Sequence, residues 1–323
     1  MFRTGTDIEL AASILRSGDV VVIPTETVYG LSANAFNPEA VKKIFAIKKR
    51  PLFNPLIVHS DSLTKVEQYV AEFPLKAKKL SEKFWPGPLT IVLKKSNIIS
   101  EIVTGGNSTV AVRIPNHPLT IALLKLLDFP LAAPSANPFG FISPTTPQHV
   151  EEQLGDKIKY ILDGGKCMVG IESTIIGFFE DEPEILRFGG ISIEDIEAII
   201  GKVKIKNNDF LENPIAPGQL KSHYAPKHKL IFGDLEKMIK KGDYNPVKIG
   251  ILSFNNLYSM IPQENQIRLS KNLDLNEAAG NLFDSLRKLD KLDIEVIFAE
   301  EFPNRELGRA INDRLTRASA ERY

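Results

Sequence analysis

A stretch of broken sequence between Lys202 and Lys229 limits the fold of this chain more than any other feature. No hydrophobic periodicity survives among its breakers, which are Asn207-Asn208-Asp209, Asn213-Pro214, Ala216-Pro217-Gly218 and Ala225-Pro226. The chain of 323 residues is also too long for one average core. The sequence therefore predicts one domain over residues 1–205 and another over residues 229–323. The linker between them is residues 206–228, and its segment of residues 217–226 is expected to be too polar and too broken to pack as a core element.

The part before the linker alternates short apolar runs with amphipathic helices. Residues 20–24 form a continuous apolar run, typical of a strand that is buried on both faces. Asn37 and Pro38 begin a helix, because proline favours the first helical position. Helices intervene at no fixed period, so the pattern favours a mixed α/β sheet over repeated βαβ units. Further strands are expected at residues 56–59, 89–94, 109–113, 131–134, 160–162, 173–177 and 184–187.

The part after the linker has a more regular pattern. Asp274 caps an amphipathic helix, and strands are expected at residues 229–232, 248–254, 267–269 and 295–299. Strands that alternate with helices predict a second, smaller, Rossmann-like domain of three layers around a parallel sheet. A last helix begins near Arg305, and we interpret its arginines as a solvated face: Arg305, Arg309, Arg314 and Arg317.

Composition excludes several classes of function. The chain has 40 basic and 40 acidic side chains, whereas a protein that holds nucleic acid mainly through phosphates has a basic excess. One cysteine, Cys167, rules out an intrachain disulfide, and we expect it to be a buried thiol. The five histidines have no ligand-like spacing, so no protein-held metal is predicted. Without a signal-peptide pattern or an apolar run of ~20 residues, we expect a cytoplasmic protein with no membrane contact.

Polar residues follow several of the expected strands. Thr25-Glu26-Thr27 comes directly after the first buried run, and Ser135-Ala136-Asn137 and Glu172-Ser173-Thr174 occupy similar places. Ligands of open α/β sheets bind at strand ends, so these residues are candidates for a binding site. The alternative is a set of turns whose hydroxyl groups bond their own backbone. Neither of the common Gly-rich nucleotide-binding motifs is present.

Basic residues suggest what such a site would bind. Lys48 and Arg50 run into a proline-bounded loop, where they could hold a polyphosphate, although a solvated helix end is the alternative. Arg113 and Arg187 lie in apolar runs, where each guanidinium needs an anion from the protein or from a ligand. No covalent nucleophile is indicated. Positioned cations and hydroxyls suit a reaction driven by charge stabilisation, such as adenylyl transfer.

Together these motifs resemble the YrdC-type domain of threonylcarbamoyl-AMP synthases. The linker's residues 217–226 are similar to the signature of the two-domain branch of that family. The resemblance covers about residues 5–230, and beyond them only position and expected topology match. The matching segments, in the family's order, are residues 24–31, 48–59, 84–90, 111–115, 134–137, 170–174 and 186–190.

The resemblance implies an open twisted α/β sheet with a concave, positive site. It implies a nucleotidyltransferase that converts L-threonine, bicarbonate or CO₂, and ATP into threonylcarbamoyl-AMP and pyrophosphate. The product would pass to a tRNA threonylcarbamoyl transferase for the modification of tRNA position 37, and any contact with tRNA would be local. Mg²⁺ is expected with ATP, with no evident protein ligand.

The resemblance also implies a role for individual residues. Lys48 and Arg50 would be the catalytic residues, near the phosphates. Tyr224 would bring the linker over the bound nucleotide and so exclude water. The residues that would bind L-threonine are Thr27, His59, Arg113, Ala133 and Ser173. The residues that would bind ATP are Arg50, Asn54, Thr109, Ser135, Asn137, Ser143, Arg187 and Tyr224.

Two alternatives stay open at this point. A carbamoyltransferase of the hydrogenase-maturation type has a similar fold, but those chains carry paired zinc-binding cysteines and this chain has one cysteine. A non-enzymatic RNA-binding module would use the positive cavity, but the balanced charge weakens that interpretation.

Overall fold

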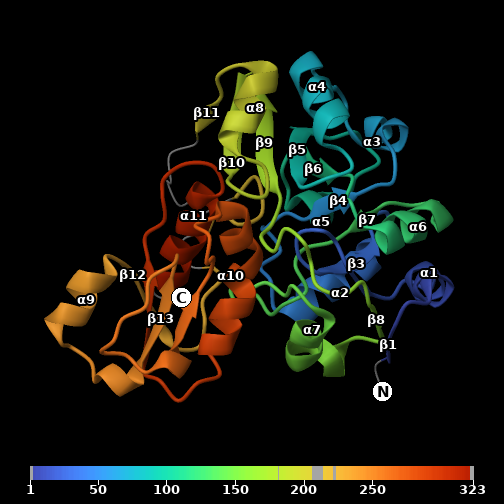
Figure 1. The fold of residues 1–323 in the computed structure, drawn as a ribbon. Helices are drawn as coiled ribbons and strands as arrows, with labels where there is room; N and C mark the ends of the chain where they lie inside the picture. The colour runs from blue at the N-terminus through green and yellow to red at the C-terminus, as the bar shows by residue number, and fades with distance from the viewer. Residues whose placement is uncertain (1–2, 181, 206–213, 221–222, 321–323) are drawn as a thin grey trace. The chain divides into compact units, whose positions relative to one another are not determined.

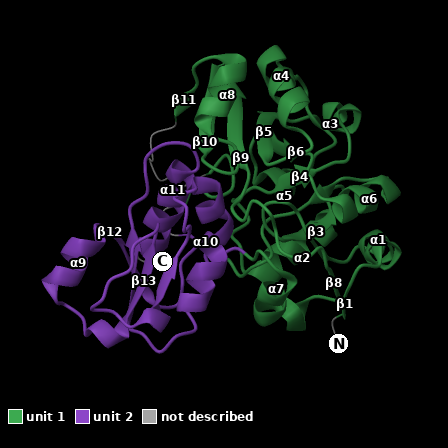
Figure 2. Ribbon diagram, in the orientation of Figure 1, with its two compact units in different colours: residues 1–139, 144–220 green, residues 140–143, 221–323 purple. Residues whose placement is uncertain are grey.

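The chain divides into two compact units (Figure 2). Unit 1 comprises residues 1–139 and 144–220, and unit 2 comprises residues 140–143 and 221–323. The computed structural model describes residues 3–180, 182–205, 214–220 and 223–320. Of the expected linker, residues 206–213 and 221–222 therefore lie outside the described residues. Within the described ranges, no helix is both long enough and apolar enough to cross a membrane.

Unit 1 is built on an eleven-stranded mixed sheet in the order β1-β8-β2-β3-β7-β4-β6-β5-β9-β10-β11 (Figure 1). Parallel pairs such as β4 with β6 alternate with antiparallel pairs such as β5 with β6, so the expected mixed sheet is confirmed. The strands are β1 Arg3–Gly5, β2 Val21–Ile23, β3 Gly30–Asn34, β4 Ile57–His59, β5 Leu89–Lys94, β6 Thr109–Arg113, β7 Leu131–Ala132, β8 Tyr160–Leu162, β9 Thr174–Phe179, β10 Glu182–Arg187 and β11 Lys204–Ile205.

Strand β2 shows why a continuous apolar run fits this sheet. Successive side chains of a strand point to opposite faces. Val22 packs into the larger core cluster, while Val21 and Ile23 pack into a second cluster with Leu15 of α1 (Ile8–Arg16) and Leu123 of α6 (Pro118–Leu126). Both faces of the strand are therefore covered, as the sequence predicts.

The helices of unit 1 begin with local capping signals. Asn37 caps α2 by accepting hydrogen bonds from the backbone N–H groups of Glu39 and Ala40, and Pro38 occupies the first helical position. The helix ends at Lys48, because Lys49 adopts a left-handed conformation with φ of 52°. The helices are α1 Ile8–Arg16, α2 Pro38–Lys48, α3 Leu63–Tyr69, α4 Leu75–Phe84, α5 Glu101–Thr104, α6 Pro118–Leu126, α7 Pro147–Leu154 and α8 Ile193–Ile200.

Unit 2 contains a four-stranded sheet in the order β12-β15-β13-β14, and all three strand pairs are parallel. The expected parallel sheet is thus confirmed. Its strands are β12 Lys229–Gly233, β13 Ile249–Ser253, β14 Gln266–Arg268 and β15 Val296–Glu300. Its helices are α9 Leu235–Lys241, α10 Leu275–Leu289 and α11 Gly308–Ser319.

The interpretation of the α11 arginines as a solvated face is wrong for two of the four. Arg314 is fully buried, and Arg317 is 7% exposed. Both pair with Asp313 of the same helix, at 2.6 Å from Arg314 Nη1 and 2.9 Å from Arg317 Nε. Hydrophobic patterning treats arginine as polar, so it misses a guanidinium whose burial depends on a neighbouring carboxylate.

The expectation that residues 217–226 do not pack as a core element is also wrong for the residues that the structure describes there, and the neighbouring Ala216 is buried as well. Ala216 joins an apolar cluster with Ile57 and Val92, and its backbone N–H donates to the side-chain carbonyl of Gln219. In unit 2, Tyr224 is 1% exposed and stacks on Phe283 with ring centroids 5.6 Å apart. Side-chain hydrogen bonds and aromatic stacking thus bury these residues although the segment has no hydrophobic periodicity.

Candidate functional site

Four of the candidate side chains of unit 1 meet at one edge of its sheet. β4 is parallel to β6, and their register pairs His59 with Arg113 at the carboxyl ends of both strands. β5 is antiparallel to β6 and parallel to β9, so the beginnings of β5 and β9 lie at the same edge. Ser173 directly precedes β9, and Arg187 ends β10, which is antiparallel to β9. The topology therefore brings these four side chains to one edge.

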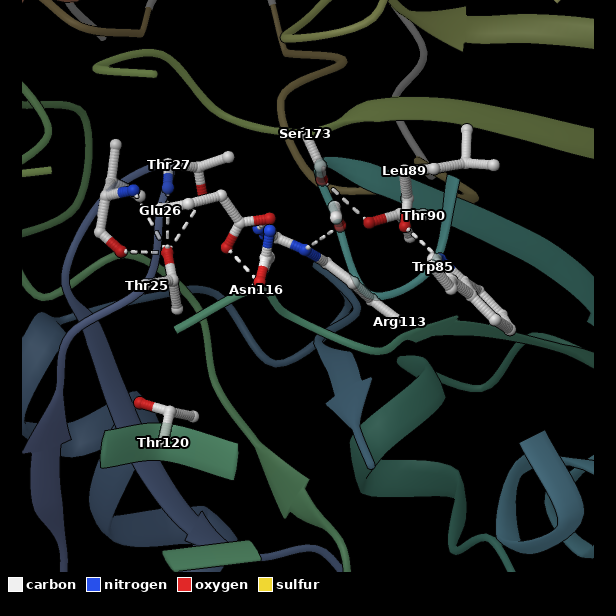
Figure 3. A network of polar contacts seen from close by, with 12 residues as sticks. Thr25, Glu26, Thr27, Trp85, Leu89, Thr90, Arg113, Asn116, Thr120 and Ser173 are labelled. Carbon is white, nitrogen blue, oxygen red and sulfur yellow. Dashed lines mark hydrogen bonds and ion pairs between the residues drawn. The ribbon is translucent and has the colours of Figure 1, made fainter. Parts of the chain in front are cut away.

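Arg113 has a carboxylate partner within unit 1 (Figure 3). Its Nη2 atom lies 2.8 Å from Oε1 of Glu26, and its Nε donates to the backbone oxygen of Gly87 at 3.2 Å. The second oxygen of Glu26 accepts the backbone N–H of Asn116 at 3.0 Å. The sequence made Glu26 a candidate for a binding site, but it did not predict that Glu26 is the partner of Arg113. The available signal was its position between Thr25 and Thr27.

His59 is a neutral imidazole beside this charge. Burial, together with the nearby charge of Arg113, lowers the pKa of His59 to about 3. Its Nδ1 lies 3.2 Å from the backbone oxygen of Ile57, which also accepts the N–H of Ala133. The imidazole is therefore suited to hydrogen bonding with a ligand and not to carrying charge at neutral pH.

Hydroxyl groups line the same region. The hydroxyls of Thr25 and Thr27 are 2.8 Å apart, and Thr25 also donates to the backbone oxygen of Val28. The turn alternative is thus correct for Thr25. The hydroxyl of Ser173 lies 2.7 Å from that of Thr90, and both side chains are buried (Figure 3).

Arg187 is joined to Ser173 directly. Its Nε and Nη2 donate to the backbone oxygen of Ser173 at 3.1 and 2.9 Å, and Nη2 also reaches the hydroxyl at 3.1 Å. Its Nη1 donates to the backbone oxygen of Pro217. The turn after β10 lies very close to the backbone of Ser173, since a Cβ added at Gly189 would be 2.3 Å from the carbonyl carbon of Ser173. Glycine is therefore required there by space.

Lys48 and Arg50 form a second buried group of cations. Lys48 Nζ donates to the backbone oxygens of Ser135 and Asn137, each at 2.5 Å. Arg50 donates to the backbone and side-chain oxygens of Asn54 and to the backbone oxygen of Pro55. Burial, with the charge of Arg50 as a second cause, holds the pKa of Lys48 well below its usual range.

This arrangement excludes the interpretation of Lys48 and Arg50 as a solvated helix end, since their residues are 1% and 7% exposed. Two like charges that share a buried region favour a polyanion. Two other buried polar atoms have no hydrogen-bond partner among the described residues. They are Asn54 Nδ2 and Thr109 Oγ1, which lies at the start of β6, the opposite end of that strand from Arg113.

The other two residues expected to bind ATP belong to unit 2. Ser143 is buried at the end of the segment of residues 140–143. In the same unit, Tyr224 has a positive φ of 64°, and the guanidinium of Arg314 lies 5.0 Å from its ring centroid. The N–H of Ala225 donates to the backbone oxygen of Gly140 at 2.9 Å, so the segments that carry Ser143 and Tyr224 are paired.

Cys167 is the buried thiol that the sequence predicts, at 4% exposed. Burial raises the pKa of its thiol to about 12, so the thiolate that a nucleophile needs is not populated at neutral pH. Among the described residues, no group of three or more His, Cys, Asp or Glu side chains could hold a metal ion.

Comparisons with known proteins agree with this architecture. The "Telomere recombination" family model matches residues 13–189, and the model for the "Threonylcarbamoyl-AMP synthase, C-terminal domain" matches residues 191–320. Relatives named threonylcarbamoyl-AMP synthase from Pyrococcus abyssi and Bacillus subtilis are each 40% identical. The alignments cover 98% of this chain and 94% and 93% of those relatives.

A solved structure is similar over the whole chain. The crystal structure of P. abyssi Sua5 complexed with L-threonine superposes with a TM-score of 0.91 at 38% identity. The match covers 99% of this chain and 97% of that one. Both domain models and nearly full-length relatives thus agree, and this chain belongs to the threonylcarbamoyl-AMP synthase family.

Proposed function

We propose that this protein is a nucleotidyltransferase that forms threonylcarbamoyl-AMP and pyrophosphate from L-threonine, bicarbonate or CO₂, and ATP. The observation that carries the proposal is the burial of two cationic side chains, Lys48 and Arg50, close enough for the charge of Arg50 to lower the pKa of Lys48. A polyanion bound beside them would favour the charged form of Lys48, which burial and the charge of Arg50 disfavour. Arg113 provides a second, separate anion site in the same unit.

L-Threonine would bind around Arg113. The guanidinium would take the α-carboxylate, while neutral His59 and the hydroxyls of Thr27 and Ser173 would form hydrogen bonds with the remaining polar groups. The backbone at Ala133 completes the set. That P. abyssi Sua5 was crystallised with L-threonine supports the choice of amino acid.

ATP would bind around the second group of cations. Lys48 would contact the phosphates as a point charge and Arg50 as a fork. The carboxamides of Asn54 and Asn137 and the hydroxyls of Thr109 and Ser135 would contribute hydrogen bonds, as would Arg187. The roles of Ser143 and Tyr224 in ATP binding rest on the family resemblance, as does the linker over residues 206–228 as a cover for the site.

The reaction would proceed in two steps. The threonine amine adds to CO₂, or to bicarbonate with loss of water, and after deprotonation gives N-carboxythreonine. An oxygen of the new carboxylate then forms a bond to the α-phosphorus of ATP while the bond between the α-phosphorus and the bridging oxygen of pyrophosphate breaks. Lys48 and Arg50 would stabilise the negative charge that develops on the leaving pyrophosphate.

Mg²⁺ would arrive on the phosphates of ATP. The donors of the phosphate region are ammonium, guanidinium, amide and hydroxyl groups, so the described chain fits an ion that keeps water and phosphate ligands. Its chemistry would be charge neutralisation on the triphosphate. The labile product would pass to a tRNA threonylcarbamoyl transferase, and with 40 basic and 40 acidic residues any contact with tRNA would be local.

Pyrophosphate release from ATP tests the proposal, with threonine and bicarbonate omitted in turn. We expect release that requires both. An RNA-binding module would consume no ATP in response to threonine, and ATP consumption by a carbamoyltransferase would not require threonine.

A further inference from the structure

Glu26 and Arg113 form an ion pair with an unusual geometry. Glu26 is 7% exposed and Arg113 is 3% exposed, so both charges are removed from water. Oε1 and Nη2 lie only 2.8 Å apart, yet neither atom makes a hydrogen bond to any residue that the structure describes. The carboxylate therefore lies close to the guanidinium but out of line with its N–H bonds.

Each partner is fixed at its other end. Oε2 of Glu26 accepts the backbone N–H of Asn116, and Nε of Arg113 donates to the backbone oxygen of Gly87 (Figure 3). Within the described part of the chain, no hydrogen bond uses Nη1 or Nη2 of Arg113. Those two nitrogens form the end of the guanidinium fork, the edge at which a carboxylate can bind in a bidentate manner.

A buried arginine needs a counter-charge even when no ligand is bound. A carboxylate seated in the fork would supply that charge but would also occupy the edge that a ligand needs. The position of Glu26 avoids this conflict, since it offers negative charge beside Nη2 and leaves the N–H bonds of the fork unpaired.

We propose that Glu26 is a positioning residue for threonine binding, which holds the guanidinium of Arg113 so that its Nη1–Nη2 edge receives the amino acid's α-carboxylate. The inference rests on the proposed function. Glu26 acts through Arg113 and does not contact the substrate. Two other roles would have different consequences: Glu26 could compete with the carboxylate for Arg113, or it could bind the ammonium group of threonine.

Two analogues of threonine separate these roles. 3-Hydroxybutyrate keeps the carboxylate and the hydroxyl but lacks the amine. Threoninol keeps the amine and the hydroxyl but lacks the carboxylate. Dissociation constants for L-threonine, both analogues and ATP would be measured by calorimetry, or as inhibition constants, for the wild type and for Glu26→Gln.

The matched control is Asp19→Asn. Asp19 is a partly buried carboxylate of unit 1 that pairs with Lys159 at 2.6 Å and Lys43 at 3.4 Å, away from the proposed site. Its loss should change stability without changing the order of ligand affinities.

For Glu26→Gln we expect threonine and 3-hydroxybutyrate to bind about tenfold more weakly, as for the loss of a charge that orients a buried partner. Threoninol and ATP should stay within about twofold of wild type, because neither uses the carboxylate subsite. Glu26→Asp retains the charge but shortens the side chain, so it should show the same pattern with a smaller change. That variant keeps the test decisive should Glu26→Gln not fold.

Several results would overturn the inference. Tighter binding of threonine and 3-hydroxybutyrate would identify Glu26 as a competitor for Arg113. Weaker binding of threoninol, with 3-hydroxybutyrate unchanged, would make Glu26 the partner of the ammonium group. An equal loss for all four ligands would indicate a structural role only. If the wild type released no pyrophosphate in response to threonine, the proposed function itself would fail, and that result is separate from all of these.

Discussion

Both units bury arginines, but they compensate the charge in different ways. In unit 2, Arg314 and Arg317 share the carboxylate of Asp313, and each makes a hydrogen bond to it within a single helix. In unit 1, Arg113 has a carboxylate at 2.8 Å that accepts no hydrogen bond from it. Lys48, also in unit 1, donates to backbone oxygens alone among its described contacts.

The difference separates charges that serve the fold from charges that serve a ligand. A buried ion pair with its hydrogen bonds made is complete, and removing one partner destabilises the protein. A buried cation whose contacts leave its charge or its donors open gains most from an incoming anion. We propose on this basis that Asp313 and its arginines maintain unit 2, whereas Lys48 and Arg113 would bind substrate anions.

The largest effect is expected from the removal of the buried ammonium group. Lys48→Met keeps the apolar stem, so the fold and the melting temperature should be kept or improved. Pyrophosphate release should fall about 10³-fold, as when a charge-stabilising group is removed from an active site. The control is Lys49→Asn, an exposed neighbour in a left-handed conformation that asparagine tolerates. Near-normal release by Lys48→Met would contradict the assignment.

The corresponding change in unit 2 should act on stability. Asp313→Asn removes the carboxylate that Arg314 and Arg317 share, which should lower the free energy of unfolding by about 3 kcal/mol. Denaturant unfolding measures this, with the exposed Arg305→Ala as control. A loss below about 0.5 kcal/mol, the range of ordinary surface changes, would show that the pair does not maintain this unit.

Arg113→Ala should affect one substrate. The loss of a charge-assisted bidentate contact is worth roughly 1.5–3 kcal/mol, so we expect the KM for threonine to rise roughly ten- to a hundredfold. The KM for ATP should change far less. Steady-state kinetics with each substrate varied in turn would check this, and equal changes in both constants would count against the threonine site.

The smallest effect is the contribution of His59 to the pH dependence of the free energy of unfolding. Its pKa in the folded protein is about 3, against 6.5 in the unfolded chain, so the unfolded state binds more protons between these values. The contribution of neutral His59 to the free energy of unfolding is therefore fully present above pH 6.5 and is lost as the pH falls toward 3. Between pH 7.5 and pH 5 the wild type should lose about 2 kcal/mol that His59→Asn does not lose. Parallel pH profiles of unfolding for the two proteins would contradict a neutral buried His59.

Hydrophobic patterning predicted the elements whose burial follows from local sequence. The bounds of β5, β6 and β8 agree with the expected residues 89–94, 109–113 and 160–162. It missed β3, Gly30–Asn34, whose glycine, serine and asparagine have low strand propensity and which is held by β2 and β7 on its two sides. Such non-local pairing leaves no periodic signal.

The same limit applies to the site. The positions of Lys48, Arg50 and Arg113 at strand and helix ends indicated anion binding from sequence. Neither the Glu26 partner nor the burial of Arg314 could be predicted, because each depends on where one side chain lies relative to another. The residues around Glu26 do not indicate that its carboxylate pairs with Arg113, which lies 87 positions later in the sequence.

Calorimetric titration of ATP and L-threonine into Lys48→Met and Arg113→Ala tests the distinction between these charges most directly. Each variant should lose affinity for a different ligand. Lys48→Met should bind ATP more weakly and threonine as the wild type does, while Arg113→Ala should bind threonine more weakly and ATP as the wild type does. Asp313→Asn, measured below its unfolding transition, should bind both ligands as the wild type does. If both ligands were lost together in each variant, or in Asp313→Asn as well, the buried cations of unit 1 would be structural charges like those of unit 2.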